Sequence, residues 1–156
     1  MKKFIGTKLI NAKQMTRLDY NILRGWELPQ DENGTDEGYL VVEYLDGGQT
    51  NHPDFSGYIS WSPTTVFEKE YRPVSGMSFG LAVEALKRGE RIARSGWNGK
   101  GMWVELFLTD GYFDEEYGFP LDPYLVLKTA GNTMQPGWNA STPDVLAEDW
   151  QIVVDD

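Results

Sequence analysis

The chain has 156 residues, enough for one ordinary domain or two small ones, and its 13% aromatic content is typical of a folded protein. Its formal net charge of -10 argues against a surface that follows a nucleic-acid polymer, although a pocket can still bind a small phosphorylated ligand. It has no cysteine, which excludes disulfides and thiol chemistry, and no apolar run near the roughly 18 residues of a membrane span, so we expect a soluble, intracellular protein with no membrane partner.

The first half of the chain predicts a small α+β domain, residues 1–73. Alternating and β-branched runs predict strands at 3–10, 38–44 and 58–61, with a turn at 46–48. Thr16 is the predicted N-cap of a short helix that stops at Gly25. Ser62 is expected to cap a second helix that runs to residue 71, with Pro63 at its first position. The acidic segment 30–37 predicts a mobile loop.

A boundary is expected at 72–76, where a proline and a glycine bracket the seam between two self-contained patterns. The second domain then covers residues 77–154. Ser78 is the predicted cap of a helix that ends at Gly89, with Phe79, Ala82, Val83 and Leu86 on one face. Strands are predicted at 91–94, 102–108, 124–128 and 150–154, a loop at 109–122, and a helix entry at 141–144 followed by one or two turns through 149. Each domain is therefore expected to be a twisted, mostly antiparallel sheet with one or two short helices.

The segment from Gly96 to Trp103 is the most unusual in composition, with three glycines and two tryptophans in eight residues. Asn98-Gly99 is typical of a type I′ hairpin turn, in which both central residues have positive φ. Gly-Trp-Asn occurs here at 96–98 and again at 137–139. This echo predicts two glycine-hinged indoles that face each other across one pocket. The alternative, that both indoles fill the core, stays open.

Binding chemistry is better represented than bond-breaking chemistry. Aromatic faces can stack on a base, hydroxyls, amides and carboxylates can bond base edges or ribose, and cations can meet phosphates. The candidate ligand-binding residues are Arg94, Trp97, Asn98, Gly99, Lys100, Met102, Trp103, Trp138, Asn139, Ser141, Thr142 and Asp144. Each also has a structural alternative, as core filler or as a helix cap.

No catalytic set emerges from the sequence. His52 is the only histidine and lies in a turn with the composition of a surface loop, and no nucleophile elbow or phosphate-binding loop motif is present. Carboxylates are dense at Asp110, Asp114, Glu115 and Glu116 and again at Glu148-Asp149, but an exposed acidic loop and a helix-end turn explain them. We therefore expect no catalytic residue, no metal and no cofactor.

Two other functions stay open on the residues alone. The first is a nucleotide hydrolase or lyase that works through carboxylates such as Asp144 and Asp149. The second is a virion component or protein inhibitor that docks on a protein through its tryptophan-rich surface.

Residues 77–154 resemble the phage Thoeris anti-defence type two family. The segments that carry the resemblance are Met77-Ser78-Phe79-Gly80-Leu81-Ala82, Ala85-Leu86-Lys87, Gly89, Ala93-Arg94-Ser95-Gly96-Trp97-Asn98-Gly99-Lys100-Gly101-Met102, Lys128-Thr129-Ala130 and 141–150. The resemblance implies a protein of the host cell cytoplasm that sequesters a cyclic nucleotide immune signal without cleaving it. The implied ligand is a cyclic ADP-ribose isomer made by a bacterial TIR-domain enzyme, or a cyclic dinucleotide. It further implies a small α+β fold and a homo-oligomer, dimer or tetramer, with pockets shared between subunits. Residues 1–73 resemble another small phage domain of unknown role.

Overall fold

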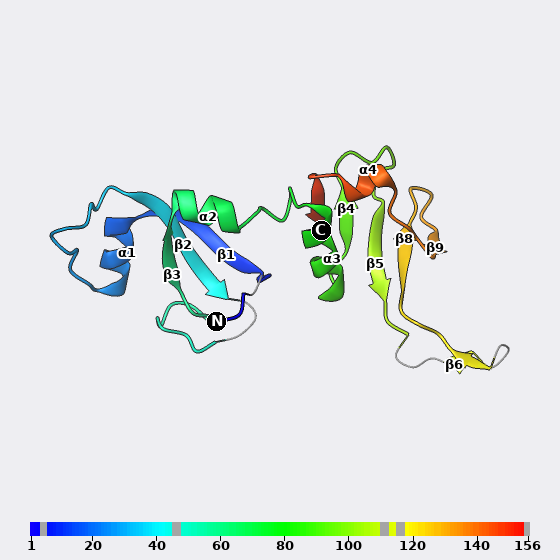
Figure 1. Cartoon of the computed structure of the whole chain (residues 1–156), viewed down its shortest axis with the longest axis horizontal. Coiled ribbons are helices and arrows are strands. Elements are labelled where there is room, and N and C mark those ends of the chain that lie inside the picture. The colour runs from blue at the N-terminus through cyan, green and yellow to red at the C-terminus, as the bar shows by residue number, and fades with distance from the viewer. Residues whose placement is uncertain (4–5, 45–47, 110–112, 115–117, 155–156) are drawn as a thin grey trace. The chain divides into compact units, whose positions relative to one another are not determined.

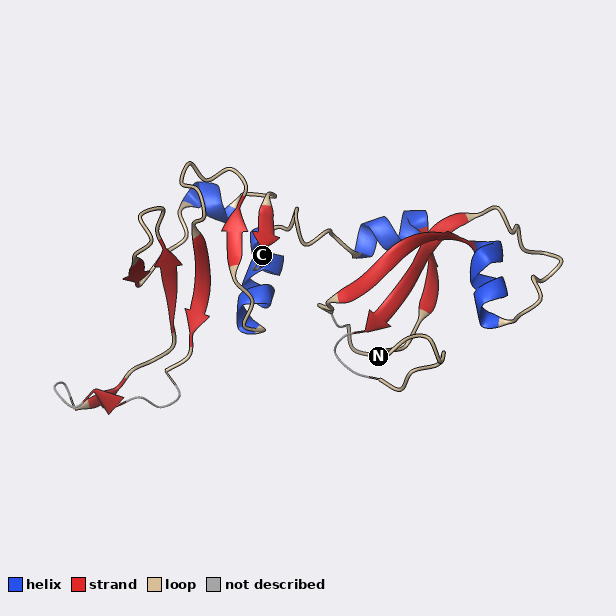
Figure 2. Ribbon diagram, turned by 180° about the vertical axis from the view of Figure 1, so that it is seen from behind, coloured by secondary structure: helices blue, strands red, loops and turns tan. Residues whose placement is uncertain are grey.

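The computed structural model describes residues 1–3, 6–44, 48–109, 113–114 and 118–154 (Figure 1). The chain divides into two compact units, Met1–Tyr71 and Arg72–Asp156. Their main sheets have three and five strands, all paired antiparallel, and the helices are short (Figure 2). The predicted α+β class with mostly antiparallel sheets is confirmed.

The N-terminal unit is a three-stranded sheet with two helices. Its elements are β1 (Ile10–Thr16), α1 (Arg17–Arg24), β2 (Glu37–Tyr44), β3 (Ser60–Pro63) and α2 (Thr64–Glu70), and the strand order is β1-β2-β3. The helix prediction at Thr16 is confirmed, because the Thr16 side chain accepts a hydrogen bond from the Asp19 amide at 3.1 Å. Gly25 ends α1 in the left-handed conformation, with φ 67°. Tyr20, Leu40 and Ile59 form the buried core.

Three predictions for this unit were wrong in position. The first strand covers 10–16, not 3–10, because β1 pairs with β2 along its whole length and leads into α1 without a loop. The third strand covers 60–63, not 58–61. Ser62 lies in that strand opposite Tyr39, so Pro63, not Ser62, is the N-cap of α2. Residues 46 and 47 of the predicted turn lie outside the described residues.

The acidic segment 30–37 is tied to the start of α1. The first N–H groups of a helix have no partner within the helix. Here the Arg17 amide donates to the Asp36 carbonyl at 2.9 Å and the Leu18 amide to the Gly34 carbonyl at 3.0 Å. Residue 37 itself opens β2. The segment therefore works as a capping loop for α1.

Gly38 marks a position in β2 where no side chain fits. A Cβ there would lie 2.4 Å from Cζ2 of Trp61 and 2.5 Å from the Ser62 carbonyl oxygen. We expect Gly38→Ala to destabilise the N-terminal unit by about 1 to 3 kcal/mol through overpacking. Gly6→Ala, with nothing within 4 Å, is the matched control and should change stability by less than about 1 kcal/mol. Urea denaturation followed at the Trp61 indole resonance checks both, and equal midpoints would contradict the prediction.

The C-terminal unit is a five-stranded sheet covered on one face by a helix. Its strands are β4 (Ile92–Arg94), β5 (Trp103–Phe107), β8 (Tyr124–Lys128), β9 (Met134–Pro136) and β10 (Trp150–Ile152), in the order β10-β4-β5-β8-β9. The helices are α3 (Phe79–Lys87) and α4 (Thr142–Val145). A separate pair, β6 (Phe113–Asp114) and β7 (Phe119–Pro120), lies within the predicted loop 109–122. Asp110, Glu115 and Glu116 of the acidic cluster lie outside the described residues.

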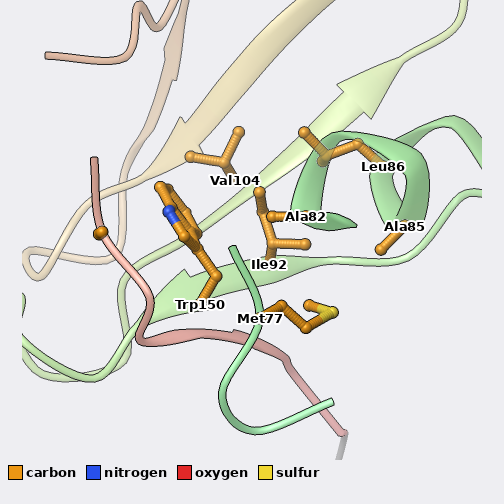
Figure 3. Close-up of a cluster of buried hydrophobic side chains, with 8 residues drawn as sticks. Met77, Ala82, Ala85, Leu86, Ile92, Val104 and Trp150 are labelled. Atoms are coloured by element: carbon orange, nitrogen blue, oxygen red, sulfur yellow. The ribbon is translucent and has the colours of Figure 1, made fainter. Parts of the chain in front are cut away.

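The core of this unit lies between α3 and the sheet (Figure 3). The helix buries Ala82, Ala85 and Leu86 against Ile92, Val104 and Trp150, so Ala85 takes the place that the sequence prediction gave to Val83. The edge strand β10 is covered by the segment before α3, because Met77 and Trp150 exchange backbone hydrogen bonds at 2.8 and 3.1 Å.

The remaining elements follow the predictions with shorter bounds. Ser141 begins α4 as expected, but the helix stops at Val145 and does not continue through 149. The strands predicted at 91–94, 102–108 and 150–154 are each shortened at one or both ends, and β9 was not predicted. β9 is a three-residue edge strand that contains a proline and is exposed at all three positions, which explains why no hydrophobic alternation marks it.

Candidate functional site

The glycine-rich loop 95–102 joins β4 to β5, and its glycines are needed for reasons other than those predicted. Positive φ occurs at Gly101 (φ 67°), and neither Asn98 nor Gly99 has it, so the predicted type I′ turn at Asn98-Gly99 was wrong. Gly99 is required by packing instead. A Cβ there would lie 2.1 Å from the Met102 sulfur and 3.1 Å from the Ala130 side chain. Close packing therefore favours glycine at position 99, and the positive φ favours glycine at position 101.

Three tryptophans meet beside this loop. The ring centroids of Trp97 and Trp138 are 6.1 Å apart, and those of Trp97 and Trp150 are 5.5 Å apart. Trp138 and Trp150 complete the triangle at 6.2 Å, and all three contacts are edge to face. Trp150 is fully buried, whereas Trp97 and Trp138 are half-buried against the same core. The two Gly-Trp-Asn indoles therefore contact each other directly and do not face each other across a pocket.

Asp144 is the polar centre of this cluster. One carboxylate oxygen accepts hydrogen bonds from the Trp97 indole and the Arg94 guanidinium, both at 3.0 Å. The other accepts from the Ser141 amide at 3.0 Å and the Ser141 hydroxyl at 2.6 Å. The Asp144 amide in turn donates to the Ser141 hydroxyl at 3.3 Å, which completes the capping box of α4. The Asp144 carbonyl accepts from the Trp150 indole at 2.9 Å. Asp144 is 8% exposed, so this network fixes α4, the loop and the core to one another.

Arg94 bridges Asp144 to a second carboxylate. Its Nε lies 2.8 Å from Asp149, whose other oxygen accepts from the Gly96 amide at 2.7 Å and from the Ser95 hydroxyl at 3.3 Å. A Cβ on Gly96 would lie 2.8 Å from that oxygen, so a side chain at this position would displace the Asp149 carboxylate. Hydrogen bonds to Asp149 and Asp144 raise the pKa of Arg94. Two carboxylates of the protein, those of Asp144 and Asp149, thus balance the charge of Arg94.

The two carboxylates are held in the ionised form. Burial on its own would raise the pKa of Asp144, but hydrogen bonds from the Ser141 hydroxyl, the Trp97 indole, the Ser141 amide and Arg94 lower it to about 2. For Asp149, the hydrogen bond from Arg94 is the largest cause of a lowered pKa. Neither group is therefore available as a proton donor near neutral pH.

Acid should weaken the C-terminal unit through Asp144. Because its folded pKa of about 2 lies below the ordinary 3.8, the stabilisation is complete above pH 3.8 and is lost as the pH falls through 2. The effect is at most about 2.5 kcal/mol, since each pH unit by which the pKa is displaced corresponds to about 1.4 kcal/mol. Urea midpoints measured between about pH 5 and pH 2 check this, with Asp144→Asn as the reference. A variant that loses stability with acid as steeply as the wild type would contradict the assignment.

The other predicted ligand-binding residues fall into two groups. The first group lies around the start of α4, where Ser141 and Thr142 join the Asp144 network. Trp138 and Asn139 come just before it in the chain, and the Asn139 side-chain amide donates to the Gly137 carbonyl at 3.1 Å. The second group lies on loop 95–102. Asn98 and Lys100 are exposed there, and Met102 is half-buried against Gly99.

Trp103 is the predicted site residue that the structure separates from the cluster. It neighbours the core residue Val104 in β5, so strand alternation turns it to the opposite face of the sheet. There the Arg91 guanidinium lies over its ring, 4.7 Å from the centroid.

Two residues near the loop were absent from the predicted site. Asp149 holds Gly96 and Arg94, and Lys128 donates to the Gly101 carbonyl at 2.8 Å. Asp149 carried a signal in the sequence, because it follows Asp144 by five residues and precedes the buried Trp150. Lys128 lies in a segment that carries the family resemblance, but no local pattern puts it at the loop; the pairing of β5 with β8 brings it there.

His52 is more buried than the sequence indicated. Its side chain is 13% exposed, and its Nε2 lies 3.1 Å from the Leu23 carbonyl, so it links its loop to α1. In the described ranges, no three His, Asp or Glu side chains are placed to hold a metal ion. None of the helices that the structure describes combines the length and apolar composition of a membrane crossing.

The C-terminal unit is thus a small α+β domain whose glycine-rich loop is anchored by an arginine bridging two carboxylates. Residues 77–153 match the Thoeris anti-defense 2-like domain, and through them the chain belongs to that family. It is similar to the Thoeris anti-defense 2 protein of Bacillus phage SP01, with 43% identity over 86 residues. That match covers 94% of the relative and 49% of this chain. The resemblance drawn from the sequence is confirmed, and residues 1–76 lie outside the matched domain.

Proposed function

We propose that the C-terminal unit is a phage anti-defence module that binds a cyclic nucleotide immune signal in the host cytoplasm and sequesters it without cleavage. The ligand is a cyclic ADP-ribose isomer or a cyclic dinucleotide. The family relationship supports the anti-defence role. The observation that carries the binding role is the rigid anchoring of loop 95–102: the network around Asp144 and Arg94 fixes the loop from beneath while Asn98 and Lys100 remain exposed on it.

The ionisation of the carboxylates favours binding over catalysis. A general acid works best with a pKa near the working pH. Asp144, with a pKa of about 2, and Asp149, with a pKa also lowered, are both paired with Arg94. The alternative of a carboxylate-dependent hydrolase or lyase would require one of them to leave this pairing.

The loop also indicates which cation meets the phosphates. The charge of Arg94 is compensated by two carboxylates, whereas Lys100 is exposed at the loop surface and Lys128 is held at the Gly101 carbonyl. We therefore assign the phosphate contact chiefly to Lys100 and a positioning role to Arg94.

Lys100→Gln should weaken binding of the nucleotide about tenfold or more, because a charge-assisted hydrogen bond to phosphate is lost. The matched control is Lys87→Gln, since Lys87 is also exposed but pairs with Glu84 on α3 at 2.8 Å. Isothermal titration of both variants gives the comparison. Equal affinities for the two variants would remove Lys100 from the site.

One experiment tests the function itself. The full chain is screened by thermal shift against cyclic ADP-ribose isomers and cyclic dinucleotides, and the ligand that stabilises it is incubated with it and then released by heat. We expect the intact molecule to be recovered in a fixed ratio to protein. Recovery of a cleaved product in molar excess over the protein would establish an enzyme instead.

Light scattering of the same sample tests whether the protein is the dimer or tetramer that the family resemblance implies. Capture of a bacterial protein without any small-molecule thermal shift would favour a protein inhibitor.

A further inference from the structure

The N-terminal unit contains a groove that the anti-defence domain does not include. It lies at one end of the three-stranded sheet, where β1 ends, β2 begins and β3 leads into α2, and Thr16 pairs with Glu37 and Gly38 with Pro63 at this end. Its volume is about 600 Å³, within the range of ligand-binding clefts. The lining residues are Arg17, Glu32, Asp36, Glu37, Trp61, Pro63, Thr64 and Thr65.

The aromatic wall of the groove is rigid. The Trp61 indole donates to the Met15 carbonyl at 2.9 Å, which fixes the orientation of the ring. The ring also lies against the bare backbone of Gly38, where a Cβ would come within 2.4 Å of it. Trp61 therefore presents a fixed surface that does not have to be ordered when a ligand binds.

The groove already contains a guanidinium group of the chain itself, that of Arg17. The Arg17 side chain lies over the Trp61 ring, 4.9 Å from its centroid, and donates to both carboxylate oxygens of Glu32. This is the bidentate and cation–π geometry in which proteins hold guanidinium groups. The contacts of Arg17 thus show that Trp61 and Glu32 can bind a guanidinium group.

The lining of the groove carries an excess of negative charge. Arg17 donates to both oxygens of Glu32 and also feels the charge of Asp36, but in the described part of the chain no ion pair uses the carboxylate of Asp36 or Glu37. One arginine against three carboxylates leaves the lining with a net formal charge of -2. The hydroxyls of Thr64 and Thr65 add hydrogen-bonding groups beside them. Such a lining repels phosphates and carboxylates and attracts cations.

We propose that this groove binds a ligand with an ammonium or guanidinium group, with the cation at the carboxylates of the lining, Asp36 above all, and its carbon chain beside Trp61. The same chemistry is available from a free polyamine and from a lysine or arginine side chain of a protein. The site is independent of the nucleotide function, because every lining residue belongs to the N-terminal unit.

The test follows the indole N–H resonances of the full chain in a titration with spermidine and, separately, with blocked arginine amide and a blocked Gly-Arg-Gly peptide. We expect a saturable shift at Trp61 with at least one probe. Tighter binding of the peptide than of the arginine amide and spermidine would identify a protein segment as the source, and the reverse order a polyamine.

The variants decide whether the groove is the site. Asp36→Asn/Glu37→Gln should weaken binding about tenfold or more, because both charged acceptors are removed. Glu27→Gln/Asp31→Asn removes the same charge from the same unit outside the groove and should bind as the wild type does. An equal loss in both double variants, or no saturable shift at Trp61 with any probe, would overturn the proposal. Thermal melting of both variants verifies that each is folded.

Discussion

Replacing Asp144 with alanine should destabilise the C-terminal unit by about 3 kcal/mol. The change leaves the Trp97 indole N–H without its acceptor, removes one of the two partners of Arg94 and abolishes the capping box of α4. Breaking a buried ion pair costs about 3 to 5 kcal/mol, and a lost N-cap interaction about 1 kcal/mol. The lower end of that range applies, because Asp149 still pairs with Arg94.

Asp149→Ala is the matched control for this prediction. Asp149 contacts the same arginine, but its side chain is 31% exposed against 11% for Asp144, so water can replace more of what is lost. Its effect should be roughly half as large. Urea denaturation followed at the Trp150 indole resonance isolates the C-terminal unit from the N-terminal one. If Asp144→Ala cost less than Asp149→Ala, Asp144 would not be the centre of the network.

Local signals in the sequence predicted both ends of α1 and the start of α4, but not the start of α2 or the end of α4. Thr16 and Gly25 bound α1, and Ser141 begins α4, because a cap and its partner lie within a few residues of each other and require no knowledge of the fold. The strand bounds were less accurate. β1 was displaced by about its own length, since its position depends on pairing with a strand more than twenty residues away.

The residues of the site were predicted, but the contacts among them were not, because those contacts join segments far apart in the sequence. The sequence singled out Arg94, Trp97, Trp138 and Asp144, and the structure brings them together. It did not show that they contact one another in place of an open pocket, because the Trp97–Asp144 hydrogen bond joins residues 47 positions apart. The turn prediction at Asn98-Gly99 failed because positive φ occurs at Gly101, and the close contact of Gly99 with Met102 and Ala130 is not visible in a local pattern.

Trp97→Ala and Trp138→Ala should both abolish nucleotide binding, but only the first should strongly destabilise the unit. Trp97 donates to Asp144 and contacts two other indoles, so we expect a loss of about 2 to 4 kcal/mol on its removal. Trp138 contacts Trp97 and Trp150 from the rim of the core, and the hydrogen bond from its backbone amide to the Leu125 carbonyl survives the substitution. A loss of about 1 to 2 kcal/mol is expected there.

Trp97→Phe separates packing from hydrogen bonding at the first position. Phenylalanine keeps an aromatic ring in the cluster but gives Asp144 no donor, so it should cost about 1 kcal/mol more than a matched Trp138→Phe. Calorimetric titration and urea denaturation on the same samples measure both effects. If Trp97→Ala melted as the wild type does and still lost the ligand, Trp97 would be a stacking surface and not part of the core. If Trp138→Ala kept wild-type affinity, the proposed pocket would have to lie away from the tryptophan cluster, beside the exposed residues Asn98 and Lys100.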